Sequence, residues 1–289
     1  MQQRIKHYRM AALCEALAVS PSGYRAWLHR PVNPYKEALK ETVSISYRAH
    51  KARVGAPSIT AELKAQGFTM SMRTIGRVMR CLGLRAKSSR QFKCTTDSNH
   101  KFGASPNGLN RVFTVSKPNQ VWVGDITYIR TDEGWLYLAV MLDLYSRQVV
   151  GWQMGSRIDR HLVCDALQAA LLTRGNPLGL MVHSDQGVQY ASNDCHALIA
   201  KHALTQSMSR RGNCWDNAVA ESFFATLKKQ AVHGERFLTR HQAQQTIFEY
   251  IECYYNRVRR HSTIGWVSPV DFETAYYKSI EGMPVHLID

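Results

Sequence analysis

Residues 121–155, VWVGDITYIRTDEGWLYLAVMLDLYSRQVVGWQMG, contain three apolar runs separated by two short polar turns. Each run has the length of a strand and is rich in β-branched and aromatic residues, with turns at TDEG and near YSR. Beyond this segment, helical patterns alternate with short apolar runs as far as residue 208. Three consecutive strands followed by alternating helices and strands predict an α/β fold, a mixed sheet flanked by helices.

Positive charge is concentrated in the first part of the chain. The 289 residues carry a formal net charge of +15. Residues 1–118 contain 21 Lys and Arg against 5 Asp and Glu, whereas residues 119–289 contain 16 against 17. A solvated basic surface is one interpretation, although solubility does not require this segregation. A nucleic-acid-binding arm joined to a near-neutral domain accounts for both the total and its distribution.

The basic part has helical periodicity and divides into two pieces. In residues 1–35, one short helix ends near Ala18 and a second begins at Ser22, with Tyr24, Trp27 and Leu28 facing inward. This all-α pattern is helix-turn-helix geometry, and a small helical pair that contacts no DNA would have the same pattern.

The second piece, residues 36–86, is predicted to be another helical DNA-binding domain. We expect Ser58 to cap one helix and Ser71 to cap the next. One side of the second helix is apolar and the other carries Arg73, Arg77 and Arg80, which suits a DNA major groove or its phosphate edge. Residues 87–117 lack periodicity and are interpreted as a basic linker, and residues 118–280 as the α/β domain with C-terminal helices.

Three carboxylates stand out in the α/β domain. Asp125 interrupts an apolar strand, Asp185 ends a second one, and Glu221 begins a helix, with 35 residues between the last two. An ionised carboxylate in a central strand is costly unless it is paired or holds a cation. The three could converge on two Mg²⁺ or Mn²⁺ ions about 4 Å apart, an arrangement that catalyses phosphoryl transfer. Separate capping and surface carboxylates are the alternative.

Several other chemistries lack their residues in this chain. There is no GKS/T loop for nucleotide phosphates, no HExxH and no GxSxG. The seven cysteines include no CxxC pair, which favours reduced thiols over a disulfide framework or a zinc site. The start of the sequence does not look like a signal peptide, and no apolar run is long enough to span a membrane, so we expect a cytoplasmic protein with no membrane partner.

Four ordered segments carry a family resemblance: QVWVGDITYI, VHSDQGVQY, GNCWDNAVAESFFATLK and YYNRVRRHSTIGWVSPVDFE. With the 35-residue spacing, they resemble the DDE transposases of bacterial insertion sequences, specifically the downstream-frame OrfB product of the IS-three family. The resemblance covers nearly the whole chain. It implies a ribonuclease-H-like, retroviral-integrase-like catalytic core in which Asp125, Asp185 and Glu221 form the metal-binding triad.

The resemblance also implies a reaction and its partners. A metal-activated water cuts one strand at an element end, and the freed 3′-OH attacks another phosphodiester, so the protein is expected to catalyse DNA transposition, integration and recombination. Lys228, seven residues after Glu221, matches a basic position that the family carries on this helix and is expected to face DNA. The expected partners are double-stranded DNA of the element ends and target, further copies of the chain on that DNA, and the upstream-frame OrfA protein or its fusion.

Other residues are secondary candidates, and other functions are rivals. His183 and Asn217 could orient the proposed ligands, Asp143 is a further strand carboxylate, and Trp215 could stack on a base. A second group of basic residues follows a helix expected to begin near Thr239 and to end at Asn256, and is expected to contact phosphates: Arg257, Arg259 and Arg260. A non-catalytic DNA-binding regulator and a nuclease that does not join strands are the alternatives to a transposase.

Overall fold

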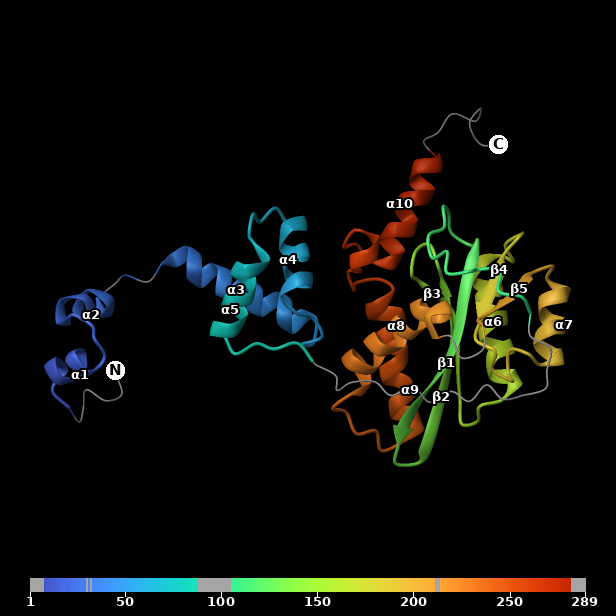
Figure 1. Ribbon diagram of the computed structural model, residues 1–289, viewed down its shortest axis with the longest axis horizontal. Coiled ribbons are helices and arrows are strands. Elements are labelled where there is room, and N and C mark those ends of the chain that lie inside the picture. The colour runs from blue at the N-terminus through green and yellow to red at the C-terminus, as the bar shows by residue number, and fades with distance from the viewer. Residues whose placement is uncertain (1–7, 30, 32, 88–104, 211–213, 282–289) are drawn as a thin grey trace.

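The computed structural model describes residues 8–29, 31, 33–87, 105–210 and 214–281. Figure 1 shows two parts, a group of N-terminal helices and a larger unit in which helices surround a sheet. Among the helices within these ranges, none has both the length and the apolar character that crossing a membrane requires.

The larger unit is built on a five-stranded mixed sheet. Its strands are β1 (Val121–Thr131), β2 (Gly134–Asp143), β3 (Val149–Gly155), β4 (Met181–Ser184) and β5 (Thr205–Met208). They lie in the order β3-β2-β1-β4-β5. The first three strands form an antiparallel meander, and β4 and β5 run parallel to β1. The predicted mixed sheet flanked by helices is confirmed.

Helices cover both faces of this sheet (Figure 1). On one face, Trp122 packs in a cluster with α6 (Arg160–Arg174) and α7 (Asn193–Lys201). On the other, Val121 and Val123 pack against α8 (Ala218–Leu227) and α9 (Arg240–Phe248). Because side chains alternate along a strand, odd-numbered residues at the start of β1 face α8. Each of α8 and α9 continues into a π-helical stretch, Lys228–Val232 and Glu249–Tyr255, and α10 (Pro269–Glu281) follows.

The N-terminal part contains α1 (Met10–Ala16), α2 (Pro21–Leu28), α3 (Pro34–Ala49), α4 (Ala56–Ala65) and α5 (Met72–Cys81). The last three share a small apolar core that includes Val43, Ile59 and Ile75. Ser71 caps α5 as predicted, since its hydroxyl accepts from the Thr74 amide at 3.2 Å.

Two details of the N-terminal prediction are wrong. Helix α4 begins at Ala56, after Gly55, and not at a Ser58 cap. Proline at position 57 is compatible with the first helical turn, where amide groups have no intrahelical partner. In α2, Tyr24 is buried, but Trp27 and Leu28 are 53% and 40% exposed. They do not face inward because the helix packs against little besides α1.

Part of the segment predicted as a linker packs on the core. Residues 88–104 lie outside the described residues, but residues 105–117 lie on the core. The amides of Gly108 and Leu109 donate to the Ser207 hydroxyl at the end of the sheet, and Leu109 is buried. The Ser105 hydroxyl also donates to Gln206 Oε1 on β5 at 2.9 Å, so a segment without periodicity is held on the sheet.

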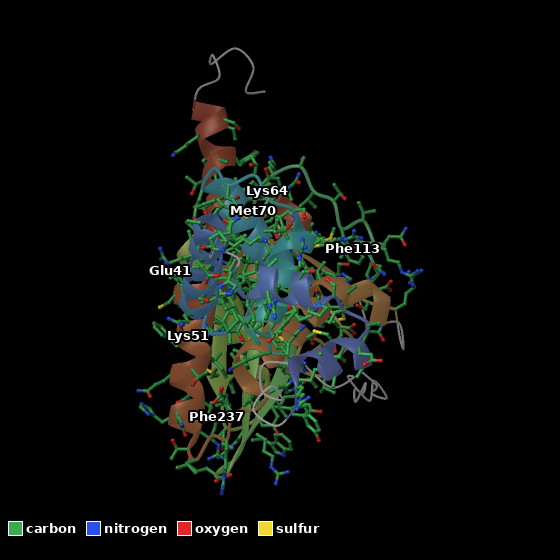
Figure 2. All side chains as sticks on the ribbon, turned by 90° about the vertical axis from the view of Figure 1, so that its left-hand side faces the viewer. Glu41, Lys51, Lys64, Met70, Phe113 and Phe237 are labelled. Carbon is green, nitrogen blue, oxygen red and sulfur yellow. The ribbon has the colours of Figure 1, made fainter. Side chains whose placement is uncertain are left out.

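The two parts meet at a specific interface centred on Arg53. Its guanidinium, only 6% exposed, forms an ion pair with Glu249 at 2.7 Å and lies over the ring of Tyr254, 4.7 Å from the centroid. His50 bridges Tyr254 and Glu62 at 3.1 and 2.9 Å. Lys51 also reaches Glu249, at 3.2 Å, but its side chain is mostly exposed (Figure 2). The helical unit is therefore docked on the core through buried polar contacts.

We expect Arg53→Ala to separate the two parts. The change removes the ion pair and the cation–π contact, and it should cost about 1–3 kcal/mol of docking free energy. Lys51→Ala is the matched control, because it removes an exposed contact to the same Glu249 and should cost less than about 0.5 kcal/mol. Chemical denaturation and the radius of gyration from small-angle X-ray scattering test this. Equal behaviour of the two variants would show that Arg53 does not hold the interface.

Candidate active site

Asp125 and Asp185 are brought together by the pairing of β1 with β4. The parallel ladder pairs Val121 with Met181 and ends at Val123 with His183. Asp125 and Asp185 occupy the next equivalent positions, two residues beyond this last pair. Neighbouring strands lie about 4.8 Å apart, so the two aspartates flank the point where β4 leaves β1.

The charges at this point favour a cation. Burial raises the pKa of Asp125 well above its usual range, and the nearby Asp185 carboxylate raises it further. Glu221 acts in the same direction more weakly, while the Lys228 ammonium opposes the shift. A carboxyl group in a partly buried place, with a second carboxylate near enough to oppose its ionisation, fits the oxygen-rich environment that binds Mg²⁺ or Mn²⁺.

Glu221 stands apart from the two aspartates. It is the fourth residue of α8, and its side chain is exposed, although partial burial raises the pKa of its carboxyl group. As the described side chains stand, no three acidic, histidine or cysteine groups are close enough together to hold a metal ion. The structure therefore places Asp125 and Asp185 close together, and it leaves Glu221 exposed at the rim of the candidate site.

Asp216 fixes the loop that leads into α8. Its carboxylate is fully buried and accepts from Arg210, Arg111 and Asn107 at 2.8 to 3.0 Å. The Arg210 hydrogen bond, together with Arg111, holds the pKa of Asp216 far below its usual range. This cluster ties residues 105–111 to the start of α8. This cluster was not predicted from the sequence, although two adjacent arginines, Arg210 and Arg211, shortly before a carboxylate were a signal for it.

His183 and Asn217, the two residues that could orient the proposed ligands, lie next to this loop. His183 is a fully buried residue of β4, with Nδ1 2.8 Å from the Ser207 hydroxyl on β5 and Nε2 3.1 Å from the Asp216 carbonyl oxygen. Burial lowers the pKa of His183. Asn217 donates from Nδ2 to the Gly124 carbonyl oxygen at 3.2 Å. Both residues thus hold the start of α8 against the sheet.

Lys228 lies at the same end of the sheet. Its ammonium group is 4.8 Å from the centroid of the Tyr128 ring. Burial lowers the pKa of Lys228, and the Asp125 carboxylate opposes that shift. A half-buried ammonium beside the proposed carboxylates can contact an anionic substrate group.

The remaining candidates are distributed over the molecule. Asp143 is fully buried and accepts from the amides of Asn119, Tyr145 and Ser146, which is a structural role in a turn. The side chain of Trp215 lies outside the described residues. The α5 arginines, Arg73, Arg77 and Arg80, are exposed.

The C-terminal arginines differ in their surroundings. Arg257 is exposed, and its Nε donates to the Glu252 carbonyl oxygen. Arg259 lies over the Tyr255 ring, 5.6 Å from the centroid, and Arg260 donates to the Trp266 carbonyl oxygen. Arg257 is therefore the most accessible of the three.

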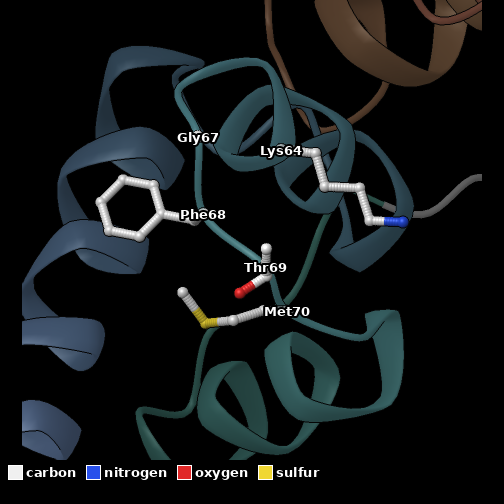
Figure 3. Close-up of a pocket in the computed structure, with 5 residues that line it drawn as sticks. All are labelled: Lys64, Gly67, Phe68, Thr69 and Met70. Atoms are coloured by element: carbon white, nitrogen blue, oxygen red, sulfur yellow. The ribbon is translucent and has the colours of Figure 1, made fainter.

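An open hollow lies at the turn between α4 and α5, away from the carboxylates (Figure 3). It is lined by Lys64, Gly67, Phe68, Thr69 and Met70. This lining contains no carboxylate, histidine or cysteine, so it offers no site for the chemistry considered above.

Family models match most of the chain. Two segments, residues 115–214 and 221–276, match models described as "Integrase core domain", and residues 34–92 match an "HTH-like domain". Among solved structures, the chain is similar to an HTLV-2 integrase catalytic core domain in complex with magnesium, with 15% identity, a TM-score of 0.42 and coverage of 54% of this chain and 97% of that one.

Curated relatives match at much higher identity. The chain is 45% identical over 271 residues to transposase InsF for insertion sequence IS3fB of Escherichia coli (strain K12), covering 92% of this chain and 94% of the relative. It is 40% identical over 269 residues to an IS600 31 kDa protein of Shigella sonnei, covering 92% and 99%. On this evidence, the chain belongs to the IS3 family of insertion-sequence transposases.

Proposed function

We propose that this protein is a DDE transposase that cuts and joins DNA strands at the ends of an insertion sequence, using divalent cations held by Asp125, Asp185 and Glu221. The observation that carries the proposal is the placement of Asp125 and Asp185 side by side where β1 and β4 diverge, with the pKa of Asp125 raised by burial and by its neighbour. Membership of the transposase family supports the reaction class.

Each residue has a defined part in this proposal. Asp125 and Asp185 supply fixed oxygen ligands from the sheet, and Glu221 supplies a third from α8 by moving its side chain inward. Divalent ions at such a site activate the attacking oxygen and stabilise the leaving oxygen of a phosphodiester. Lys228 neutralises substrate phosphate at the same edge, and the Asp216 cluster holds α8 in place.

DNA binding is assigned to two groups of arginines. Arg73, Arg77 and Arg80 project from α5, the third helix of the segment that matches an HTH-like domain, and are free of ion pairs among the described residues. Arg257, Arg259 and Arg260 are the second group, with Arg257 contributing most because it is exposed. Phosphate contacts from both groups would position the element end near the carboxylates.

Assembly is also part of the proposal. One catalytic site cuts one strand at a time, whereas an insertion sequence has two ends, so we infer that two or more copies act together on DNA. The upstream-frame OrfA protein, or a fusion with it, is the proposed additional partner.

Mapping the reaction products tests the function. The protein is incubated with Mg²⁺ or Mn²⁺ and a labelled supercoiled plasmid that carries the DNA flanking its gene, and the new ends are sequenced. Cleavage at the element boundary followed by joining supports the transposase. Cleavage without joining would indicate a nuclease, and binding without cleavage, even after addition of OrfA, would indicate a regulator.

A further inference from the structure

Asn217 lies at the point where β4 separates from β1, which we call the fork between β1 and β4. The β1–β4 ladder ends at Val123 and His183, and the next carbonyl along β1, that of Gly124, accepts from Asn217 Nδ2 at 3.2 Å. Asn217 is only 4% exposed. Its side chain is therefore inserted beside the backbone of Asp125, at the place where β4 leaves β1.

The orientation of this amide follows from chemistry. A carbonyl oxygen only accepts hydrogen bonds, so the amide nitrogen of Asn217 must face Gly124 and its oxygen must point elsewhere. That oxygen, Oδ1, is buried and has no hydrogen-bond partner among the described residues. An unsatisfied buried acceptor destabilises the fold, so its retention calls for a partner.

The usual partner is not used. Asn217 is the N-cap residue of α8, where an asparagine oxygen commonly accepts from an amide of the first helical turn. Here the side chain makes no capping hydrogen bond. Glu221 lies one helical turn further along, on the same face of α8 as Asn217. Oδ1 is thus left without a partner on a side chain that is hydrogen-bonded to Gly124, the residue before Asp125.

We propose that Asn217 serves the cation site in two ways: Nδ2 fastens the start of α8 to β1, and Oδ1 is a neutral oxygen donor for the divalent cation. Mg²⁺ and Mn²⁺ prefer oxygen ligands, and a neutral donor adds no repulsion to the carboxylates. This inference rests on the proposed function. It gives the cation one more contact, at the start of α8, besides the Glu221 side chain that the proposed function moves inward.

The test measures Mn²⁺ binding to the full chain by the electron paramagnetic resonance signal of free Mn²⁺, with thermal unfolding measured in parallel without metal. Asn217→Ala removes both groups and should weaken Mn²⁺ binding about tenfold or more. Asn217→Asp keeps an oxygen but loses the donor to Gly124, so it should unfold at a lower temperature without metal and still bind Mn²⁺ at least as tightly as wild type.

Asn256→Ala is the matched control. Asn256 is also 4% exposed, and its amide both accepts from the Val149 amide and donates to the Val149 carbonyl on β3, far from β4 in the sheet. This variant should lose thermal stability and keep wild-type Mn²⁺ affinity. It separates general loosening of the fold from an effect at the cation site.

The outcomes are distinguishable. If Asn217→Ala loses stability but binds Mn²⁺ like Asn256→Ala, or if Asn217→Asp binds as weakly as Asn217→Ala, Oδ1 is no donor and the inference is overturned. If the wild type itself binds no Mn²⁺, or binds it unchanged after Asp185→Asn, the cation site of the proposed function fails instead.

Discussion

Asp185→Asn is expected to abolish DNA cleavage and joining while leaving the metal-free protein as stable as wild type or more stable. The loss of one cation ligand removes several kcal/mol of transition-state stabilisation, a decrease in rate of about 10³-fold or more. Without a cation, the same change removes a negative charge beside Asp125, whose pKa is raised by burial and by Asp185. Function and stability should therefore respond in opposite directions.

The sign of the pH dependence follows from the same pair. An acid whose pKa is raised by folding holds its proton more tightly in the folded state, so stability falls as pH rises above about 4, the unfolded pKa, towards the folded pKa. Urea denaturation in EDTA from pH 4 to 8 should show this fall for wild type and a smaller one for Asp185→Asn. Added Mn²⁺ should stabilise only the wild type.

Asp143→Asn is the control for the change from aspartate to asparagine. Asp143 is fully buried, and its carboxylate accepts from three backbone amides. In Asp143→Asn the side-chain NH₂ group would face one of these N–H donors, so the change should destabilise the fold by about 1–3 kcal/mol. A loss of metal-free stability in Asp185→Asn as large as that in Asp143→Asn would contradict the proposed repulsion between Asp125 and Asp185.

The triple change of Arg73, Arg77 and Arg80 to Glu is expected to weaken DNA binding at least about 100-fold. If each arginine neutralises one phosphate, the slope of log affinity against log salt should also become shallower by about three units. Binding to labelled element-end duplexes between about 50 and 200 mM salt measures both quantities. Cleavage at saturating protein should be affected less than binding, because the carboxylates are unchanged.

A control with the same change in charge lies on the catalytic core. Arg157, Arg160 and Arg236 are exposed, and the last two form surface ion pairs with Asp194 and Asp132. Changing all three to Glu alters the net charge by the same amount as the triple change in α5. If it weakened DNA binding as much as the α5 variant, total charge, and not the surface of α5, would govern affinity.

The sheet could be predicted from the sequence because its signals are local. The apolar runs of residues 121–155 and the turn at TDEG are β1, β2 and β3 almost to the residue. The cap at Ser71 was predictable for the same reason. The start of α4, predicted at Ser58, shows the limit of such local signals. Both a serine cap and a proline in the first turn mark a helix start, and here the helix starts so that Pro57 lies in its first turn.

Contacts between distant residues could not be predicted. Asp216 pairs with Arg111, 105 positions earlier, and Arg53 pairs with Glu249, 196 positions later. No local sequence pattern around any of these residues indicates which distant residue it contacts. The three carboxylates were identified by type and spacing, but spacing did not indicate that Glu221 would be exposed at the rim while Asp125 and Asp185 lie together.

A crystal structure of the protein with Mn²⁺, with anomalous diffraction used to locate the ions, would test whether the three carboxylates hold divalent cations. We expect manganese at the fork between β1 and β4, bound by Asp125 and Asp185, with the Glu221 carboxylate turned inward to bind it as well. Manganese at another place, or at the fork with Glu221 still turned away while the crystals cleave bound DNA, would contradict it.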